Sequence, residues 1–313
     1  MGVYIAGRLA STFVVMAIVG LIVFLLLHLA PGSPAAIIAG DNATSAQIAA
    51  INHQLGLDRP LPVQFLVWAG QVLRGNFGTS IFSGEPVMRL ILQRLPATLS
   101  LSLVTIAFAG TLAVIGGVLA AWRAGGVLDR ILMGVAALGF SVPVFVVGYL
   151  LIYLFAITLH WLPVQGYMPF RRGFWPWFSH LILPALSLGL AYLALIARIT
   201  RASVLEVLAE DYMRTARAKG ATPASQLFHH ALRNAGVPIA TVIGIGVALL
   251  ISGVVLTETV FNIPGVGRLT VDAITNRDYP IIQGIMVIFA GAYVVVNLLV
   301  DLSYSLIDPR IRR

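Results

Sequence analysis

Long runs of apolar residues dominate the pattern of this chain, and they recur six times. Each run is close to or above the roughly 20 residues that an α-helix needs to cross the hydrocarbon of a membrane. The six runs lie at about 9–30, 98–122, 131–159, 181–200, 237–263 and 281–307. The pattern therefore predicts an all-α, polytopic membrane protein with six transmembrane helices.

The first run could instead be a secretory signal peptide, because it lies close to the N-terminus. Its apolar core is longer than the roughly 7–15 residues of a signal peptide's hydrophobic region, and further predicted spans follow it. We expect a retained transmembrane helix.

Composition supports lipid as the solvent of this chain. Of its 313 residues, 59% are hydrophobic and only 10% are charged, and the mean hydropathy is +0.94. A soluble chain carries about 25% charged residues, so this one has too few to cover a water-facing surface. Cysteine is absent, which excludes disulfides and thiolate metal sites.

The net charge of +8 suits either a nucleic acid partner or a basic cytoplasmic face. Six spans put both termini on one side. If that side is the cytoplasm, twelve of the 20 Lys and Arg residues lie there and eight lie outside. Four of those eight fall in one external segment of about 65 residues, too long to count fully in the positive-inside rule. We predict cytoplasmic termini and no nucleic acid partner.

Several residues within the apolar runs carry structural expectations. Glu258 and Asp301 lie near span ends, where helix capping or snorkelling is expected rather than a proton relay, which would sit deeper with a partner. Three prolines favour kinks, at 143, 184 and 238. Five glycines either allow close helix approach or simply fill the bundle: Gly116, Gly117, Gly148, Gly244 and Gly246.

Two external segments have patterns of their own. In residues 31–97, Leu61, Phe65, Trp68 and Val72 recur at helical spacing, which suits a helix on the membrane surface, a helix on the bundle or a small folded cap. Residues 160–180 gather aromatic side chains beside two arginines, as in an interfacial aromatic belt or a docking surface for an external partner.

The cytoplasmic loop between the fourth and fifth spans predicts two helices around a glycine break. A helix from about Glu206 ends at Gly220, a residue that accepts the left-handed conformation after a helix. Thr222 and Pro223 then suit an N-cap and a first helical position, starting a helix that runs to about Asn234. This pattern suits either a basic linker attracted to anionic lipid or a rigid handle for another protein.

No recognisable catalytic site is present in the sequence. A phosphate-binding loop ends in Gly-Lys-Ser or Gly-Lys-Thr, but the chain's one lysine, Lys219, follows Ala218. Its six histidines lack the spacing of a zinc hydrolase, and no Gly-x-Ser-x-Gly elbow occurs. We predict no enzyme activity, no metal site and no cofactor bound by this chain.

The loop also resembles a family signature. The run 210–220 (EDYMRTARAKG), continuing to 230–235 (HALRNA), resembles the cytoplasmic motif of binding-protein-dependent ABC importer permeases of the dipeptide, oligopeptide and nickel branch. Arg214-Thr215-Ala216 stands where many such permeases have Glu-Ala-Ala. Arg233 stands where the general motif has proline, and Pro238 comes later, as in the peptide branch.

The resemblance extends along nearly the whole chain. Further matching segments occur in the same order, at 55–64, 75–80, 94–98, 180–185, 258–268, 277–280 and 308–313.

The resemblance implies a type I ABC transmembrane domain that acts in the inner membrane of a prokaryote. It implies three divisions: 1–93 with the first helix and external segment, 94–307 with the transmembrane core and a coupling loop at about 201–236, and the tail 308–313. Implied partners are a second permease, two ATPase subunits that hold ATP and Mg²⁺, an external solute-binding protein and membrane lipid. The residues expected to couple to the ATPase are Arg214, Thr215, Ala216, Ala218 and Gly220.

Two rival functions follow from other classes. An ion-coupled secondary transporter acting alone would need ionisable residues near mid-membrane and usually an internal repeat. An intramembrane enzyme would need catalytic groups at depth. We find neither pattern, and the cargo among dipeptides, oligopeptides, glutathione and nickel complexes stays open, with peptide as the default.

Overall fold

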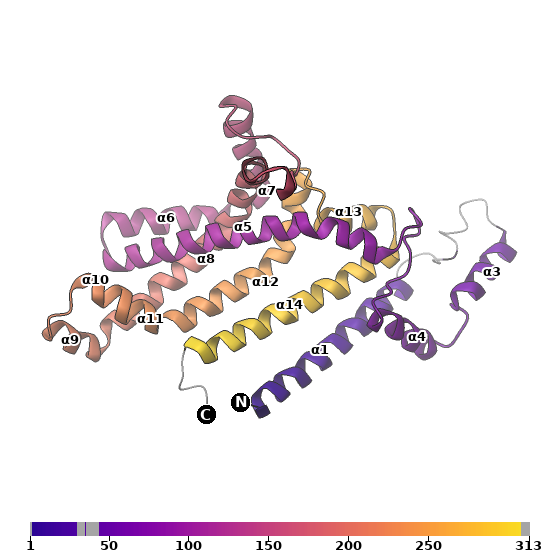
Figure 1. Cartoon of the computed structure of the whole chain (residues 1–313), viewed down its shortest axis with the longest axis horizontal. Helices are drawn as coiled ribbons and strands as arrows, with labels where there is room; N and C mark the ends of the chain where they lie inside the picture. Colours follow the sequence, from indigo (N-terminus) through magenta and orange to yellow (C-terminus); the bar gives the residue numbers. More distant parts are fainter. Residues whose placement is uncertain (1, 30–34, 36–43, 308–313) are drawn as a thin grey trace. The chain divides into compact units, whose positions relative to one another are not determined.

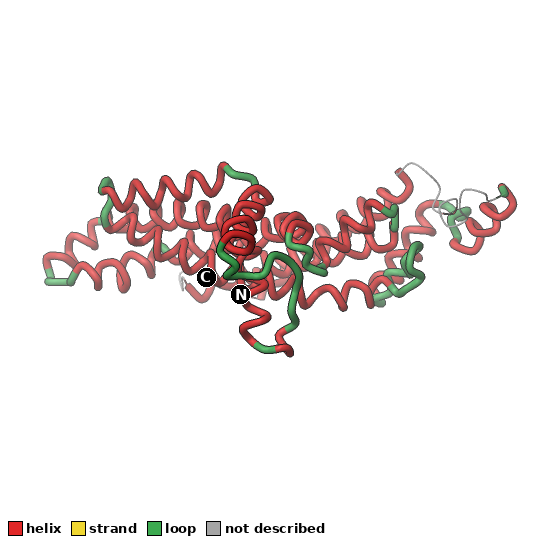
Figure 2. The backbone as a smooth tube through the Cα atoms, turned by 90° about the horizontal axis from the view of Figure 1, so that it is seen from above, coloured by secondary structure: helices red, strands yellow, loops and turns green. Residues whose placement is uncertain are grey.

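A computed structural model describes residues 2–29, 35 and 44–307. Those residues are almost entirely helical and contain no β-strand (Figures 1 and 2). The chain divides into two compact units: Met1–Arg94 with Leu269–Val294, and Leu95–Arg268 with Val295–Arg313. The predicted cytoplasmic tail, 308–313, lies outside the described residues.

The first unit holds the N-terminal helices and most of the segment 31–97 that the sequence predicts to be external. Its helices are α1 (Gly2–Leu29), α3 (Ser45–Leu55), α4 (Leu61–Leu73), and the first parts of α5 (Val87–Trp122) and α14 (Tyr279–Ile307). The predicted apolar face of α4 packs on α1, since the rings of Phe65 and Trp68 lie 5.4 and 5.8 Å from the ring of Phe24. Of the three alternatives for this segment, a helix packed on another helix, here α1 of the same unit, fits best.

A buried carboxylate ties down the loop before α5. Asp278, which precedes α14, accepts hydrogen bonds from the Ser80 hydroxyl at 2.5 Å and from the backbone N–H groups of Ile81 and Phe82 at 3.2 and 3.4 Å. The sequence segments 75–80 and 277–280, which resemble the same family, thus meet in one structural feature.

The second unit holds the main bundle. Its helices are the rest of α5, α6 (Val127–Ser141), α7 (Val144–Leu151), α8 (Phe174–Ala209) and α12 (Gly236–Val260), with α8 packed against α6, α7 and α12 (Figure 1).

Glycines permit the close packing of this bundle at some of the predicted positions. A Cβ at Gly117 would lie 2.7 Å from the carbonyl oxygen of Ala197, and one at Gly148 would lie 3.2 Å from the Phe261 ring. A Cβ at Gly244 would overlap Val300, whereas one at Gly116 would meet open space. Close approach is therefore confirmed at three of these glycines and absent at Gly116.

The third predicted run is not one straight helix. α6 and the segment made of α7 and η1 (Ile152–Thr158) meet at an angle of 106°, with Val142 and Pro143 at the break. Proline lacks a backbone N–H and its ring disfavours helical conformation in the preceding residue, which explains a break here. Pro184, by contrast, lies inside the unbroken α8.

Three described helices are long and apolar enough to cross a membrane: Val87–Trp122, Phe174–Ala209 and Tyr279–Asp301. The bent pair α6 and α7–η1 brings the number to four if it forms one span. α1 and α12, which carry the first and fifth predicted spans, contain shorter apolar stretches at Ala10–Leu26 and Gly236–Val247.

Glu258, near the end of α12, is completely buried and so does not snorkel. Its carboxylate accepts a hydrogen bond from the backbone N–H of Arg268, in the first turn of α13 (Val266–Thr275), at 2.9 Å. A carboxylate is stabilised at a helix N-terminus by the free N–H groups there. Of the two predicted roles, helix capping is the one that Glu258 has.

The aromatic segment 160–180 presents large apolar side chains on the surface. Trp161, Phe170, Phe174 and Trp175 are each about three-fifths or more exposed. The short helix η2 (Phe170–Arg172) leads directly into α8, where the rings of Phe174 and Phe178 stack. The exposure suits both predicted roles, an interfacial belt and a docking surface.

Candidate functional site: the handle at residues 210–235

The handle, residues 210–235, begins at a break rather than inside a helix. α8 ends at Ala209, Glu210 adopts an extended conformation, and α9 (Asp211–Ala218) follows. The sequence predicted one helix from Glu206 to Lys219, and that boundary is wrong by about one turn. Its first residues belong to α8, so the long helix leads directly into the handle.

Gly220 ends α9 as predicted. Its φ is +85°, in the left-handed region. The Gly220 N–H donates to the Arg217 carbonyl at 3.0 Å, and the Ala221 N–H donates to the Ala216 carbonyl at 3.1 Å. These two bonds form a Schellman motif, which closes a helix by satisfying its last carbonyls.

Thr222 starts the return half of the handle. Its hydroxyl accepts from the Ser225 N–H at 3.3 Å, and Pro223 takes the first helical position, as the sequence predicted. A helical path then runs through α10 (Pro223–Ser225), η3 (Gln226–Ala231) and α11 (Leu232–Asn234) before α12 begins. The middle piece, η3, has π-helical geometry, which the sequence did not indicate.

Buried apolar residues seat the handle on the bundle. Met213 of α9 is completely buried. On the return half, Leu227, Ala231 and Ala235 pack in one cluster with Val204 of α8 and with Val118 and Ala121 of α5. Because these contacts join three helices, the handle is a packed element of the bundle rather than a free linker.

Polar contacts join the two halves of the handle to each other. The Gln226 side chain donates to the Ala221 carbonyl at 2.7 Å and accepts from the Arg217 guanidinium at 3.4 Å. The Asn234 amide donates to the Tyr212 hydroxyl at 2.5 Å. The two halves therefore hold a fixed geometry that does not depend on the bundle alone.

The predicted coupling residues lie on the outer side of α9. Arg214 is 80% exposed and pairs with Asp211 at 3.3 Å. Thr215, Ala218 and Gly220 are exposed as well, and Ala216 is half-buried. The structure thus brings the five residues together on one surface element that is open to a partner.

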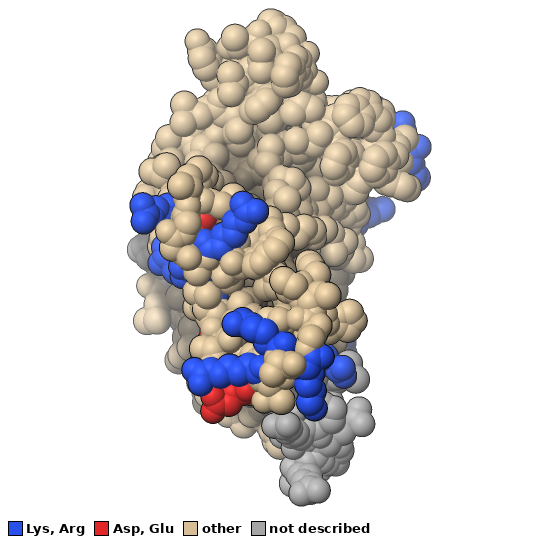
Figure 3. Space-filling view, turned by 90° about the vertical axis from the view of Figure 1, so that its left-hand side faces the viewer, with Lys and Arg blue, Asp and Glu red and all other residues tan. Residues whose placement is uncertain are grey.

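Charge and shape at this end of the second unit favour a macromolecular partner. Lys and Arg side chains gather on the face shown in Figure 3, with few acids between them. An open cavity of about 420 Å³ lies between the handle and the ends of α5 and α8. Its lining consists of Trp122, Leu208, Arg217, Ala221, Pro223, Gln226 and Leu227. Among the described residues, no group of His, Asp or Glu side chains could hold a metal ion.

Sequence reasoning missed the residues that hold the handle in place. Met213 is the one large non-aromatic apolar residue of α9, a signal that could have identified the buried side. Gln226 gave no such signal, because its partners are fixed only when the two halves fold against each other.

The sequence of this chain matches two protein-family models. Residues 113–313 match the family described as binding-protein-dependent transport system inner membrane component, and residues 1–102 match its N-terminal companion. The chain belongs to this family. The handle lies in the region 113–313, together with α6, α7, α8 and α12 of the bundle.

Named relatives match this chain over nearly its whole length. A probable peptide ABC transporter permease protein, y4tP, of Sinorhizobium fredii is 64% identical over 100% of both chains. The di/tripeptide transport system permease protein DppB of Pseudomonas aeruginosa is 42% identical over 99% of this chain and 98% of its own. A glutathione transport system permease protein, GsiC, of Salmonella choleraesuis is 43% identical with the same coverage.

The fold of this chain is similar to that of a solved structure. It resembles an inward-facing structure of the MetNI methionine ABC transporter with a TM-score of 0.60, at 17% sequence identity. The match covers 71% of this chain and 97% of that chain. At this identity the likeness concerns the fold alone.

Proposed function

We propose that this chain is a permease subunit of an ATP-driven importer of dipeptides or oligopeptides. The peptide cargo is proposed from relatives named for peptide transport at 64% and 42% identity. The observation that carries the ATP-driven mechanism is the handle, a closed and internally bonded element with an exposed outer face. Such an element suits the transfer of force between two proteins.

The proposal includes the topology that the sequence predicts. Six spans, including α1, α12 and the bent α6–α7 pair, cross the inner membrane of a prokaryote with both termini in the cytoplasm. The three-part division at residues 93/94 and 307/308 belongs to the same proposal. The basic face of the handle end supports a cytoplasmic position, because cytoplasmic segments carry an excess of Lys and Arg.

Partners complete the proposed transporter. A second permease would form the path together with this one, and membrane lipid would surround both. Two ATPase subunits would hold ATP and Mg²⁺ and contact the handle. An external binding protein would deliver the peptide, and no cofactor or catalytic residue is assigned to this chain.

The five coupling residues have distinct proposed roles. Arg214, Thr215, Ala216 and Ala218 would form the contact surface on α9, while Gly220 permits the turn that closes it. Closure of the ATPase pair would then displace α9 and, through the buried seat of the handle, the helices α5, α8 and α12. The handle couples two conformational states and creates no energy of its own.

Peptide uptake in proteoliposomes tests the proposal. The purified complex of two permeases and two ATPases, with its binding protein, should accumulate a labelled dipeptide only when ATP is present. An ion-coupled transporter would instead accumulate the peptide without ATP in response to an ion gradient, and that result would overturn the proposal.

Gly220→Val tests the role of the handle. Valine disfavours a φ of +85°, so the variant should assemble in the membrane but lose coupled ATP hydrolysis and uptake. Gly75→Val is a matched control. Gly75 has a φ of +77°, closes α4 with the same pair of hydrogen bonds, and lies outside the handle. Full transport by Gly220→Val would contradict the assignment.

A further inference from the structure

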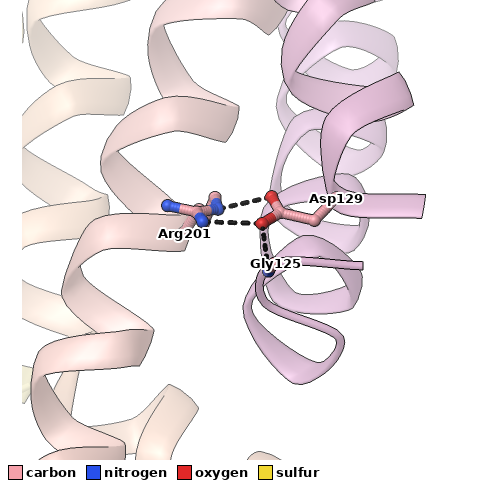
Figure 4. A network of polar contacts seen from close by, with 3 residues as sticks. All are labelled: Gly125, Asp129 and Arg201. Carbon is pink, nitrogen blue, oxygen red and sulfur yellow. Dashed lines mark hydrogen bonds and ion pairs between the residues drawn. The ribbon is translucent and has the colours of Figure 1, made fainter. Parts of the chain in front are cut away.

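A buried ion pair joins α6 to α8 near the handle (Figure 4). The Arg201 guanidinium donates from Nε to one carboxylate oxygen of Asp129 at 2.6 Å and from a terminal nitrogen to the other at 2.7 Å. The Gly125 backbone N–H adds a third bond to the same carboxylate at 2.8 Å. Arg201 lies on α8, Asp129 in the first turn of α6, and Gly125 in the turn between α5 and α6.

This pair is shielded from solvent. The Asp129 side chain is 6% exposed and that of Arg201 is 29% exposed. Removing two charges from water costs several kcal/mol per ion, and a bidentate pair only offsets that cost. Apolar residues of similar size would often give equal or greater stability. Stability alone is therefore a weak reason to place a charged pair between these helices.

Register is the better-attested use of a buried polar contact. A second contact between the same two helices defines the register here. A Cβ at Gly139 of α6 would lie 2.8 Å from the Leu190 side chain of α8, so Leu190 fills the space above that glycine. The pairs 129–201 and 139–190 run in opposite order, so the two helices are antiparallel. The two contacts are also spaced alike along the helices, with about 15 Å between residues 129 and 139 of α6 and about 16 Å between residues 190 and 201 of α8.

Apolar packing specifies this register in part, and the ion pair adds to it. A slip of one turn, about 5.4 Å, would move Leu190 from a glycine onto neighbouring apolar residues. The same slip would leave the buried Asp129 carboxylate without its charged partner, which is more costly. Asp129 and Arg201 thus penalise a slipped register in addition to the penalty from the Gly139–Leu190 contact.

α8 connects this ion pair to the handle without a break. Arg201 lies eight residues before the end of α8, and Glu210 follows that end directly. On the other side of the pair, α6 leads to the 106° bend and to α7. We infer that Asp129 and Arg201 are positioning residues that lock α6 to α8, so that α6 and α7 follow a displacement of the handle instead of slipping past it. The inference rests on the proposed function.

A double apolar variant separates positioning from stability. Asp129→Leu with Arg201→Met should give an assembled complex whose melting temperature equals or exceeds that of the unchanged protein. Its ATP consumption per peptide transported should nevertheless rise severalfold, because ATP is then consumed without a matching displacement of α6 and α7. Asp272→Asn, which changes an exposed acid on α13, is the control and should leave this ratio unchanged.

Cross-linking provides a second test that does not depend on the stability of that variant. The chain contains no cysteine, so Asp129→Cys with Arg201→Cys gives one defined thiol pair. A short bifunctional thiol reagent that a reductant can cleave should restore coupling when it joins the two thiols. Cleavage should then abolish the restored coupling in the same sample.

The two proposals fail in different ways. If the unchanged complex shows no ATP-dependent uptake, the proposed function fails before any variant is compared. If the unchanged complex transports and the apolar variant keeps its ratio of ATP to peptide, only the positioning role is overturned. A cross-linked sample that transports no better than the reduced one overturns that role as well.

Discussion

The hydroxyl of Thr98 lies 2.6 Å from the carboxylate of Glu258, to which it donates a hydrogen bond across 160 residues of sequence. The same hydroxyl accepts the backbone N–H of Val266 at 2.8 Å. Thr98 of α5 therefore connects the end of α12 to the start of α13. All three residues are buried, so the interior of the second unit contains a short polar network at this point.

Glu258→Gln should destabilise the protein by about 1–3 kcal/mol. One carboxylate oxygen accepts from Thr98 and the other from the Arg268 N–H, whereas glutamine offers one acceptor and turns an amide N–H₂ toward a donor. Thermal unfolding of the detergent-solubilised complex measures the change. Asp272→Asn, at an exposed acid of α13, should have almost no effect, and equal melting temperatures for the two variants would contradict the role of Glu258.

Gly265→Ala and Gly116→Ala should change stability in opposite directions. A Cβ at Gly265 would overlap the Glu258 carboxylate, so the variant must displace the network at a cost of about 1–3 kcal/mol. Gly116 lies inside α5 with nothing near its missing Cβ, and alanine there should stabilise the helix by about 0.5–1 kcal/mol. Melting temperatures of the two variants, compared in one detergent, check both signs.

Asp278→Asn should loosen the turn at residues 79–86. Its carboxylate receives the Ser80 hydroxyl and two backbone N–H groups, and an asparagine side chain leaves at least one of those donors facing an N–H₂ group. Amide hydrogen exchange at Ile81 and Phe82 should become faster by about five- to 150-fold, which corresponds to about 1–3 kcal/mol.

The control for that turn is Glu85→Gln, since the bond from Ser80 N–H to Glu85 uses the backbone carbonyl, which glutamine retains. Exchange at Ile81 and Phe82 should stay unchanged in this variant. If Asp278→Asn also leaves those amides protected, the carboxylate does not hold the turn.

Local features could be predicted from the sequence, because their determinants lie within a few residues of one another. Gly220 and Thr222 fix the two halves of the handle through a Schellman motif and an N-cap, and both signals are short-range. The break before Pro143 follows from the same kind of local constraint, although its angle does not. The family resemblance supplied the role of the handle, which spacing alone left open.

Long-range pairs could not be predicted in the same way. Asp129 and Arg201 are 72 residues apart, and Thr98 and Glu258 are 160 apart. Each pairing depends on the register of two helices. The hydropathy pattern indicates which face of a helix is buried, but it does not determine which turn of one helix contacts which turn of the other. The segment containing Glu258, Gly265 and Gly267 was identified as a family segment, yet the need for glycine beside the carboxylate emerges only when the fold brings them together.

Met213→Ala should loosen α9 against the elements that it contacts, α8 and η3. The Met213 side chain is completely buried, and its truncation typically costs about 2–5 kcal/mol, depending on how far the site collapses. The Gln226 and Asn234 contacts keep α9 joined to the return half, which itself stays packed on α5 and α8, so we expect local loosening of α9 and no separation of the two halves. Amides of residues 211–218 should exchange faster, while those in the middle of α8 keep their protection.

Phe228→Ala, at a handle side chain that is 61% exposed, is the control for exchange and should leave the protection of α9 unchanged. In the full complex, a loosened α9 should also reduce peptide uptake more than ATPase binding, because the contact surface on α9 remains intact while its connection to the bundle is weakened. Loss of ATPase binding with unchanged exchange would instead place Met213 in the contact surface itself.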